Sequence, residues 1–259
     1  MVRFSIMKFI LIILIVLFQA QHSHAKKIKM SKDENTKFYE RIKDPTGLAP
    51  TKKVHYFKFG SECGDIKRKE SGAKDYVGEW KGSDCVENSV RSEIAQDKQK
   101  QPKESWYRWH VYLPEDFPIQ DTGKLLLGQW HNGECPHVSF TSKNENNGKL
   151  YFETMKTWEG DCKDTMRIEF TSIQELRGKW TEFIIFSRWD YGTKGIFQIY
   201  LDGNLVLDFK GRTLTVGKKK NYLKLGIYQC CNDRKIPIKP ASAYFTNPEI
   251  SKNHLTKTK

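Results

Sequence analysis

The chain has 259 residues, 38% hydrophobic and 29% charged, and its 44 Lys and Arg against 31 Asp and Glu give a formal net charge of +13. This length suits one domain with a substantial core, and the positive charge favours an anionic partner. No helix-turn-helix, zinc-finger or RNP pattern occurs, which argues against nucleic acid as that partner.

The first 25 residues have the pattern of a secretory signal peptide. Arg3 and Lys8 precede an apolar stretch that runs unbroken over residues 9–18, and Ser23-His24-Ala25 offers a small-residue cleavage site. The run is about half of the roughly twenty residues that span a bilayer. We therefore expect cleavage after Ala25, a secreted or periplasmic location and no stable membrane insertion of the mature chain. A retained signal anchor is the alternative. Loss of Arg3 and Lys8 lowers the net charge from +13 to +11.

Residues 26–53 are rich in lysine and carry turn signals at Asp44-Pro45 and Thr46-Gly47. We interpret them as a basic lead-in of doubtful order with room for a short strand or helix. The main domain is expected over residues 54–250.

Short alternating segments rich in aromatic and β-branched residues follow the lead-in, and this pattern is typical of β-strands. The expected strands are residues 54–60, 89–96, 105–113, 124–131, 137–142, 149–155, 166–173, 180–188, 195–201, 204–209, 221–229 and 241–246. Two of them should form a hairpin that turns at Asp202-Gly203. So many strands in one domain must close into a barrel or form two packed sheets. We favour an all-β sandwich of two antiparallel sheets, with the larger sheet curved and able to hold a linear polymer on its concave face.

Six cysteines in an exported chain suggest disulfides, although six cysteines allow fifteen pairings. They are Cys63, Cys85, Cys135, Cys162, Cys230 and Cys231. We favour a Cys63–Cys85 bond and a link between loops that involves Cys135 or Cys162. Adjacent cysteines rarely bond each other, so Cys230 and Cys231 should reach separate partners. No C-x-x-C pair occurs and the histidines lack ligand spacing, so we expect no metal and no other cofactor.

Three expected strands carry chemically capable side chains two residues apart, and such side chains share one face of a strand. These segments are Arg91-Ser92-Glu93-Ile94, Gln129-Trp130-His131 and the run from Tyr222 to Gln229. In the third segment Tyr222, Lys224, Gly226 and Tyr228 should face one way, with Leu223, Leu225 and Ile227 in the core. We expect Gly226 to leave room for a ligand near the backbone.

β-Elimination from a uronate needs a neutralised carboxylate, a base for the C5 proton and an acid for the departing O4. Arg91 offers a charged planar fork and Gln129 an amide donor for the carboxylate. Each such donor contributes roughly 3–4 kcal/mol in comparable oxyanion sites. His131 can act as a base near neutral pH, and Tyr228 can donate a proton or, if ionised, take one. Glu93 should orient Arg91.

The three segments resemble, in the same order, the R-S-E-L, Q-x-H and Y-x-K-x-G-x-Y motifs of jelly-roll alginate lyases. Residues 107–114 and 128–131 look still more like the heparin lyase I-like and glucuronan lyase-like group, and the resemblance spans residues 90–245. It implies a concanavalin A-like sandwich (jelly roll) and a lyase that acts on an acidic polysaccharide of the glucuronan, heparin/heparan or alginate type. It also implies catalytic roles for His131, Tyr228, Arg91 and Gln129.

The same resemblance implies that Lys224 contacts the substrate, and we place Glu93 and Tyr222 with it. Two positions depart from the alginate lyase motifs. Ile94 replaces the usual Leu, which changes little. Trp130 stands where alginate lyases usually carry Ile or Val, which argues against alginate as the substrate.

Two other functions compete with this one. The same sandwich serves non-catalytic lectin-like binding modules, but pure binding requires no acid–base pair such as His131 and Tyr228. A retaining glycoside hydrolase of the laminarinase type would need two close carboxylates. Glu159, Asp161 and Asp164 have roughly that family's E-x-D-x-x-E spacing, although Asp164 replaces the last Glu of the motif. Nothing specific supports calcium at these acids.

Overall fold

The computed structural model describes residues 25–33, 36, 38–60, 89–97, 102–133, 135–156, 165–215, 221–233, 236 and 238–255. The signal peptide, expected over residues 1–25, lies almost entirely outside them. None of the described helices is both long enough and apolar enough to cross a membrane.

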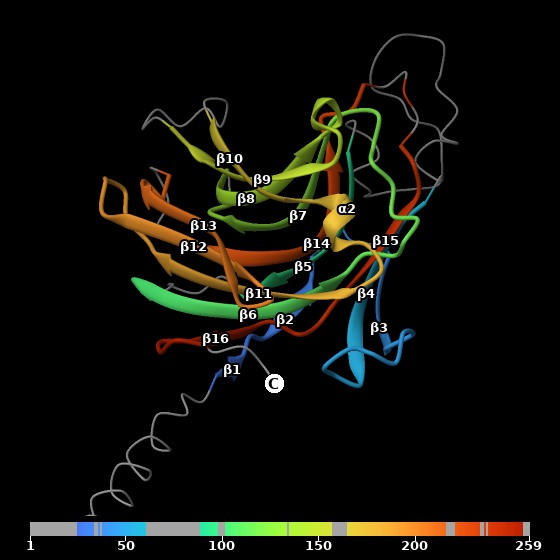
Figure 1. Ribbon diagram of the computed structural model, residues 1–259, viewed down its shortest axis with the longest axis horizontal. Coiled ribbons are helices and arrows are strands. Elements are labelled where there is room, and N and C mark those ends of the chain that lie inside the picture. Colours follow the sequence, from blue (N-terminus) through green and yellow to red (C-terminus); the bar gives the residue numbers. More distant parts are fainter. Residues whose placement is uncertain are drawn as a thin grey trace, which may run out of the picture.

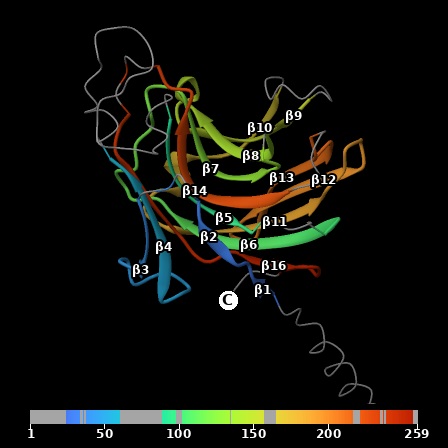
Figure 2. The same cartoon turned by 180° about the vertical axis from the view of Figure 1, so that it is seen from behind.

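The described strands form two antiparallel sheets (Figures 1 and 2). The nine-stranded sheet consists of β1 (Lys26–Lys27), β3 (Tyr39–Lys43), β4 (Lys53–Phe59), β6 (Glu104–Tyr112), β11 (Trp180–Arg188), β12 (Gly195–Leu201), β13 (Asn204–Gly211), β15 (Ala241–Phe245) and β16 (Glu249–Ser251). The seven-stranded sheet consists of β2 (Met30–Lys32), β5 (Val90–Gln96), β7 (Lys124–His131), β8 (Pro136–Lys143), β9 (Lys149–Met155), β10 (Thr165–Ser172) and β14 (Tyr222–Cys230). A 3₁₀ turn η3 (Asn144–Asn146) and a short helix α2 (Ile173–Leu176) complete the described elements. The predicted all-β sandwich of two antiparallel sheets is confirmed.

Neighbouring strands are mostly far apart in sequence. The nine-stranded sheet has the order β13-β12-β11-β6-β15-β4-β3, with β16 pairing both β6 and β1, and the seven-stranded sheet has the order β10-β9-β8-β7-β14-β5-β2. Strands β7 and β14 bend along their length in Figure 2, and register shifts interrupt their pairing. Bulges of this kind increase the local bend of a strand.

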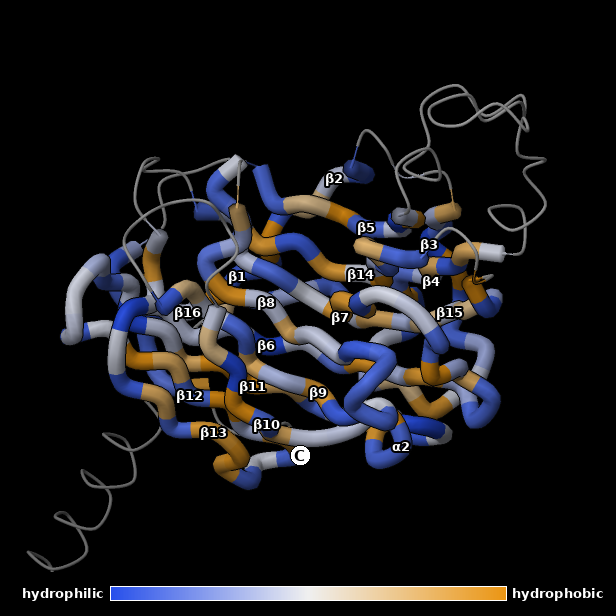
Figure 3. Tube along the Cα trace, turned by 90° about the horizontal axis from the view of Figure 1, so that it is seen from above, coloured by the Kyte–Doolittle hydropathy of each residue, from blue (hydrophilic) through white to orange (hydrophobic). Residues whose placement is uncertain are grey.

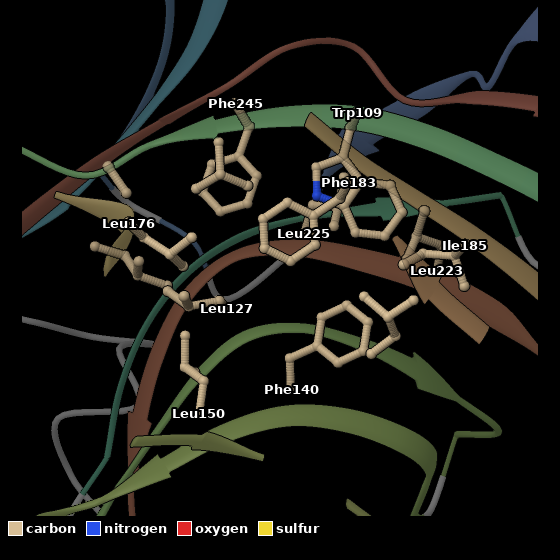
Figure 4. Packing of buried hydrophobic residues seen from close by; sticks show 14 of the residues in the cluster. Trp109, Leu127, Phe140, Leu150, Leu176, Phe183, Ile185, Leu223, Leu225 and Phe245 are labelled. Atoms are coloured by element: carbon tan, nitrogen blue, oxygen red, sulfur yellow. The ribbon is translucent and has the colours of Figure 1, made fainter. Parts of the chain in front are cut away.

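Alternation along the strands places one face of each sheet in the core. In β6 the side chains of Tyr107, Trp109 and Val111 are buried, and the residues between them are partly exposed. Figure 3 shows hydrophobic and hydrophilic residues alternating along many strands. Figure 4 shows side chains of both sheets meeting in one cluster, including Trp109 from β6 and Phe140 from β8. Burial of these faces is what holds the two layers together.

The twelve strands expected between residues 54 and 246 all form, with ends that differ by at most two residues. The predicted hairpin joins β12 and β13, where Leu201 pairs with Asn204. Asp202 and Gly203 have φ angles of 49° and 84°, the left-handed pair that a tight two-residue turn requires.

The lead-in is more ordered than the sequence indicated. Strand β2 pairs with β5, and β3 pairs with β4, so this part of the chain extends both sheets. The division into a lead-in and a main domain from residue 54 stays a prediction, and in the structure the first strands pack as part of the sandwich.

Candidate active site

The sheet order β7-β14-β5 brings the three motif segments next to one another on the seven-stranded sheet. Across β14 and β7, Tyr222 pairs with His131 and Lys224 with Gln129. Across β14 and β5, Tyr228 pairs with Arg91. The residues between them, Leu223, Leu225 and Ile227, are completely buried in the core, so the polar set lies on the opposite face as predicted. We had expected the larger sheet to carry this set, and it lies on the smaller one.

Glu93 is a buried carboxyl group that contacts both expected carboxylate binders. Its side chain has no exposed surface. Its Oε1 accepts a hydrogen bond of 2.9 Å from Gln129 Nε2, and its Oε2 lies 3.3 Å from Arg91 Nε. Burial raises the pKa of Glu93, against the opposing effect of Lys224 and Arg91. Because Glu93 is inaccessible, we revise its expected role from substrate contact to orientation of Arg91 and Gln129.

Lys224 forms an ion pair of 2.8 Å with Asp33, and both side chains are nearly buried, with 7% and 10% of their surface exposed. The chain segment that carries Asp33 is fixed to β5. Thr36 Oγ1 donates to the carbonyl of Glu93 at 2.8 Å and accepts from the Glu93 N–H at 3.0 Å. The lead-in therefore contributes a charged group to the site.

His131 is neutral in this environment. Burial, with Lys224 and Arg91 as nearby cations, lowers its pKa to about 3. Its Nδ1 accepts a hydrogen bond of 2.8 Å from the Gly133 N–H, and the Tyr222 hydroxyl lies 3.5 Å from the same nitrogen. A neutral imidazole that accepts at Nδ1 carries its proton on Nε2.

Tyr228 contacts Arg91, whose guanidinium carbon lies 4.1 Å from the centre of the tyrosine ring. Burial raises the pKa of Tyr228, and Arg91 partly offsets this effect. The phenol is therefore protonated at neutral pH and is suited to donate a proton.

A hollow of about 530 Å³ opens beside these side chains. Arg91, His131, Tyr222, Lys224 and Asp33 line it together with neighbours from β2 and β5. Its size is within the range of small-ligand sites. Tyr228 is absent from the described lining residues, but Arg91 both lines the hollow and contacts Tyr228. Arg91 thus lies beside the same hollow as His131 and also in contact with Tyr228.

The model of the family described as "Polysaccharide lyase" matches residues 65–247, more than half of the chain. The chain belongs to the polysaccharide lyase family. It is a polysaccharide lyase, and the predicted resemblance to jelly-roll lyases is confirmed.

Solved structures are similar to this chain. The endo-β-1,4-glucuronan lyase from the fungus Trichoderma reesei aligns with a TM-score of 0.60 and 12% identity over 88% of this chain and 92% of the other. Alginate lyase A1-II′, a member of polysaccharide lyase family 7, aligns with a TM-score of 0.49 and 16% identity over 83% and 84% of the two chains. A search of curated proteins gave no match.

Trp130 of the lyase does not belong to the site. It lies between Gln129 and His131, so it points to the opposite face, where it is completely buried. Its ring packs against Tyr107 and Phe197 at centroid distances of 5.2 and 5.3 Å. A core residue does not contact the substrate, so Trp130 is no argument against alginate.

The close packing of β14 against β5 requires a glycine at position 226 of the lyase. Its φ is 139°, and a Cβ there would lie 2.2 Å from the Ser92 carbonyl oxygen of β5. The glycine lets two strands approach, which corrects our expectation that it makes room for a ligand.

Asp33 is the site residue of the lyase that the sequence did not reveal. It lies in a run of lysines and acids, Lys32-Asp33-Glu34, with no motif around it. Only the pairing of β2 with β5 brings it to Lys224. The acids proposed for the hydrolase alternative, Glu159, Asp161 and Asp164, lie outside the described residues of the lyase.

The cysteines of the lyase differ from expectation in one respect. Cys135 takes part in a disulfide whose other cysteine is outside the described residues, so the pairings with Cys63, Cys85 and Cys162 stay predictions. Cys230 and Cys231, which we expected to bond separate partners, are both free thiols.

Proposed function

We propose that the lyase is exported and cleaves a uronate-containing polysaccharide by β-elimination. The observation that carries this proposal is the shared use of one buried carboxylate, Glu93, by Arg91 and Gln129. Groups fixed in this way are preorganised for the charge that develops on a substrate carboxylate as its C5 proton leaves. Glu93 already satisfies one N–H of Gln129, and the amide has a second N–H for the substrate.

In the proposed reaction Arg91 and Gln129 bind the uronate carboxylate, and Lys224 contacts the sugar chain. His131 takes the C5 proton, the electrons of the C5–H bond form the C4–C5 double bond, and the C4–O4 bond breaks. Tyr228 gives its proton to O4. Two chains result, one of them with an unsaturated uronate at its end.

The electrostatics of the site support these roles. His131 has a pKa of about 3 and is unprotonated at neutral pH. The bound carboxylate would raise this pKa, because it places a negative charge near Arg91 and His131. Tyr228 remains protonated because burial raises its pKa. The hydrogen bond from Gly133 to Nδ1 means that the ring proton must pass from Nε2 to Nδ1, which then no longer accepts from Gly133, before Nε2 can accept the C5 proton. This change of tautomer is part of the proposal.

The position of Arg91 would bring the substrate close to both proposed proton-transfer groups. Arg91 lines the hollow that His131 also lines, and it contacts the ring of Tyr228. A uronate whose carboxylate binds Arg91 would therefore have its sugar ring between His131 and Tyr228. Tyr222, near Nδ1 of His131, would support the histidine and would not transfer the proton to O4.

The test is to incubate the purified mature protein with glucuronan, alginate, heparin and heparan sulfate while following the ultraviolet absorbance of the unsaturated product. Glucuronan comes first because the glucuronan lyase shares the fold over most of the chain. The proposal expects absorbance to rise with at least one polymer. Binding to an acidic polymer without any rise in absorbance would favour the lectin-like alternative.

A further inference from the structure

Two adjacent cysteines lie where β14 ends. Cys230 is the last residue of the strand and pairs with Lys124 of β7, and Cys231 begins the turn that follows. The two sulfur atoms lie 3.0 Å apart. Cys231 has a φ of 59°, a left-handed conformation that few residues other than glycine and asparagine adopt.

The turn is held in this shape by contacts that do not involve the sulfur atoms. Gln229 Nε2 donates to Asn232 Oδ1 at 2.7 Å and to the Thr122 carbonyl at 2.6 Å. The Asp233 N–H donates to Thr122 Oγ1 at 2.6 Å. The approach of the two sulfurs is therefore imposed by the fold around them, and a strained residue persists only under such constraint.

The pair is accessible and chemically uneven. Cys230 is buried and Cys231 is exposed. Cys231 lines a hollow of about 340 Å³ whose charged residues are Lys124, Lys143, Arg167, Glu145 and Glu153. The hydrogen bond with Cys230, helped by Lys124, lowers the pKa of Cys231 to about 6. Among the described residues, neither sulfur is bonded to another cysteine. An exposed thiolate beside a buried thiol is the arrangement that favours thiol–disulfide exchange.

We propose that Cys230 and Cys231 are a modification site at which the lyase forms a vicinal disulfide. The oxidant is a small-molecule disulfide of the oxidising compartment that the proposed export implies, and to that extent the inference rests on the proposed function. The Cys231 thiolate attacks the small disulfide and releases one thiol. The Cys230 thiol then loses its proton to solvent, attacks the Cys231 sulfur and releases the second thiol. Two electrons pass from the cysteine pair to the small disulfide.

The geometric change required is small. The sulfurs must approach from 3.0 Å to about 2.05 Å. The bond would remove the thiolate from the hollow that contains Lys124, Lys143 and Arg167, and would leave this hollow more positive. It would also fix the end of the strand that carries Tyr228.

Peptide mapping after equilibration with reduced and oxidised glutathione tests the proposal on the wild-type chain. Trypsin should release residues 225–234 as one peptide that contains both cysteines and no other. In the oxidised sample we expect this peptide to be linear, two hydrogen atoms lighter, and unmodified by an alkylating reagent. Reduction should restore two alkylation sites.

Two results would overturn the inference. One is alkylation of both cysteines at every glutathione ratio. The other is recovery of the peptide only as a cross-link to a peptide with Cys63, Cys85 or Cys162, which would restore the earlier expectation of separate partners. In the Cys231→Ser variant this peptide should keep one alkylation site at every glutathione ratio, because buried Cys230 lacks the exposed thiolate that begins the exchange. Because the test uses a defined redox buffer, its failure leaves the β-elimination proposal untouched.

Discussion

Asp33 forms an ion pair of 2.8 Å with Lys224, and this contact connects the segment that follows β2 to the proposed active site. Strand β2 precedes Asp33 and β14 carries Lys224, and β5 lies between these strands in the sheet. The pair is nearly buried, and removal of one partner would leave a charge in a poorly solvated place.

Asp33→Asn should therefore lower the free energy of unfolding by about 3 kcal/mol, the lower end of the range for breaking a buried pair. Denaturant unfolding measures this. Asp97→Asn is the matched control, because the Lys29–Asp97 pair has a distance of 3.6 Å and is largely exposed; its loss should cost less than about 1 kcal/mol. If Asp33→Asn lowered the free energy of unfolding no more than the control does, the Asp33 pair would not stabilise the fold.

Glu93→Gln should keep an acceptor for Gln129 but replace the carboxyl oxygen next to Arg91. We expect kcat to fall by roughly 10- to 100-fold through misplacement of the carboxylate binders, with a smaller change in KM. Glu153→Gln is a suitable control. Glu153 is also buried and pairs with Lys124 and Arg167 on the same sheet, and its loss should affect stability more than kcat. A Glu93→Gln enzyme with wild-type kcat would refute the orienting role.

His131 should make stability depend on pH. Its pKa in the folded protein is about 3, against 6.5 for the ordinary group. Between these values the unfolded chain binds a proton that the folded protein excludes. The His131 contribution to stability is thus complete above pH 6.5 and is lost as pH falls toward 3, by up to about 1.4 kcal/mol per pH unit. The free energy of unfolding, measured with urea from pH 7 to pH 4, should fall less steeply with pH for His131→Asn than for the wild type. Parallel slopes would contradict the depressed pKa.

Nitrogen-15 NMR of the ligand-free protein should find the ring of His131 neutral and protonated on Nε2.

Binding of an acidic polymer should weaken as salt concentration rises, because the mature chain has an expected net charge of +11 and salt screens attraction beyond about 10 Å at 0.1 M. Titration of an inactive variant with each polymer at low and high ionic strength measures this. Affinity that is independent of salt for every acidic glycan would remove charge as the basis of recognition.

The twelve central strands could be predicted because alternation of buried and exposed residues is a local property of the sequence. Strands β1, β2, β3 and β16 escaped prediction for a physical reason. They are short, and β1–β3 are mostly exposed, so their structure comes from pairing with strands distant in sequence and not from a hydrophobic pattern.

The candidate site, like the fold, could be predicted from the sequence only in part. Spacing by two residues correctly placed Gln129 with His131, and Lys224 with Tyr222, on one face. The same rule applied to Trp130 would have assigned it to the core. Asp33 could not be predicted, because its place depends on the pairing of β2 with β5. The low pKa of His131 likewise depends on its burial in the folded protein and on cations from two other strands.

The central claim is tested most directly by measuring uronate release, through ultraviolet absorbance, for the wild type and for His131→Ala, Tyr228→Phe and Tyr222→Phe. We expect His131→Ala and Tyr228→Phe each to lower turnover by roughly two to four orders of magnitude, with polymer affinity and circular dichroism close to those of the wild type. Tyr222→Phe, which removes only a hydroxyl near His131, should have a much smaller effect. Wild-type turnover in both His131→Ala and Tyr228→Phe, with the fold intact, would contradict the proposed mechanism.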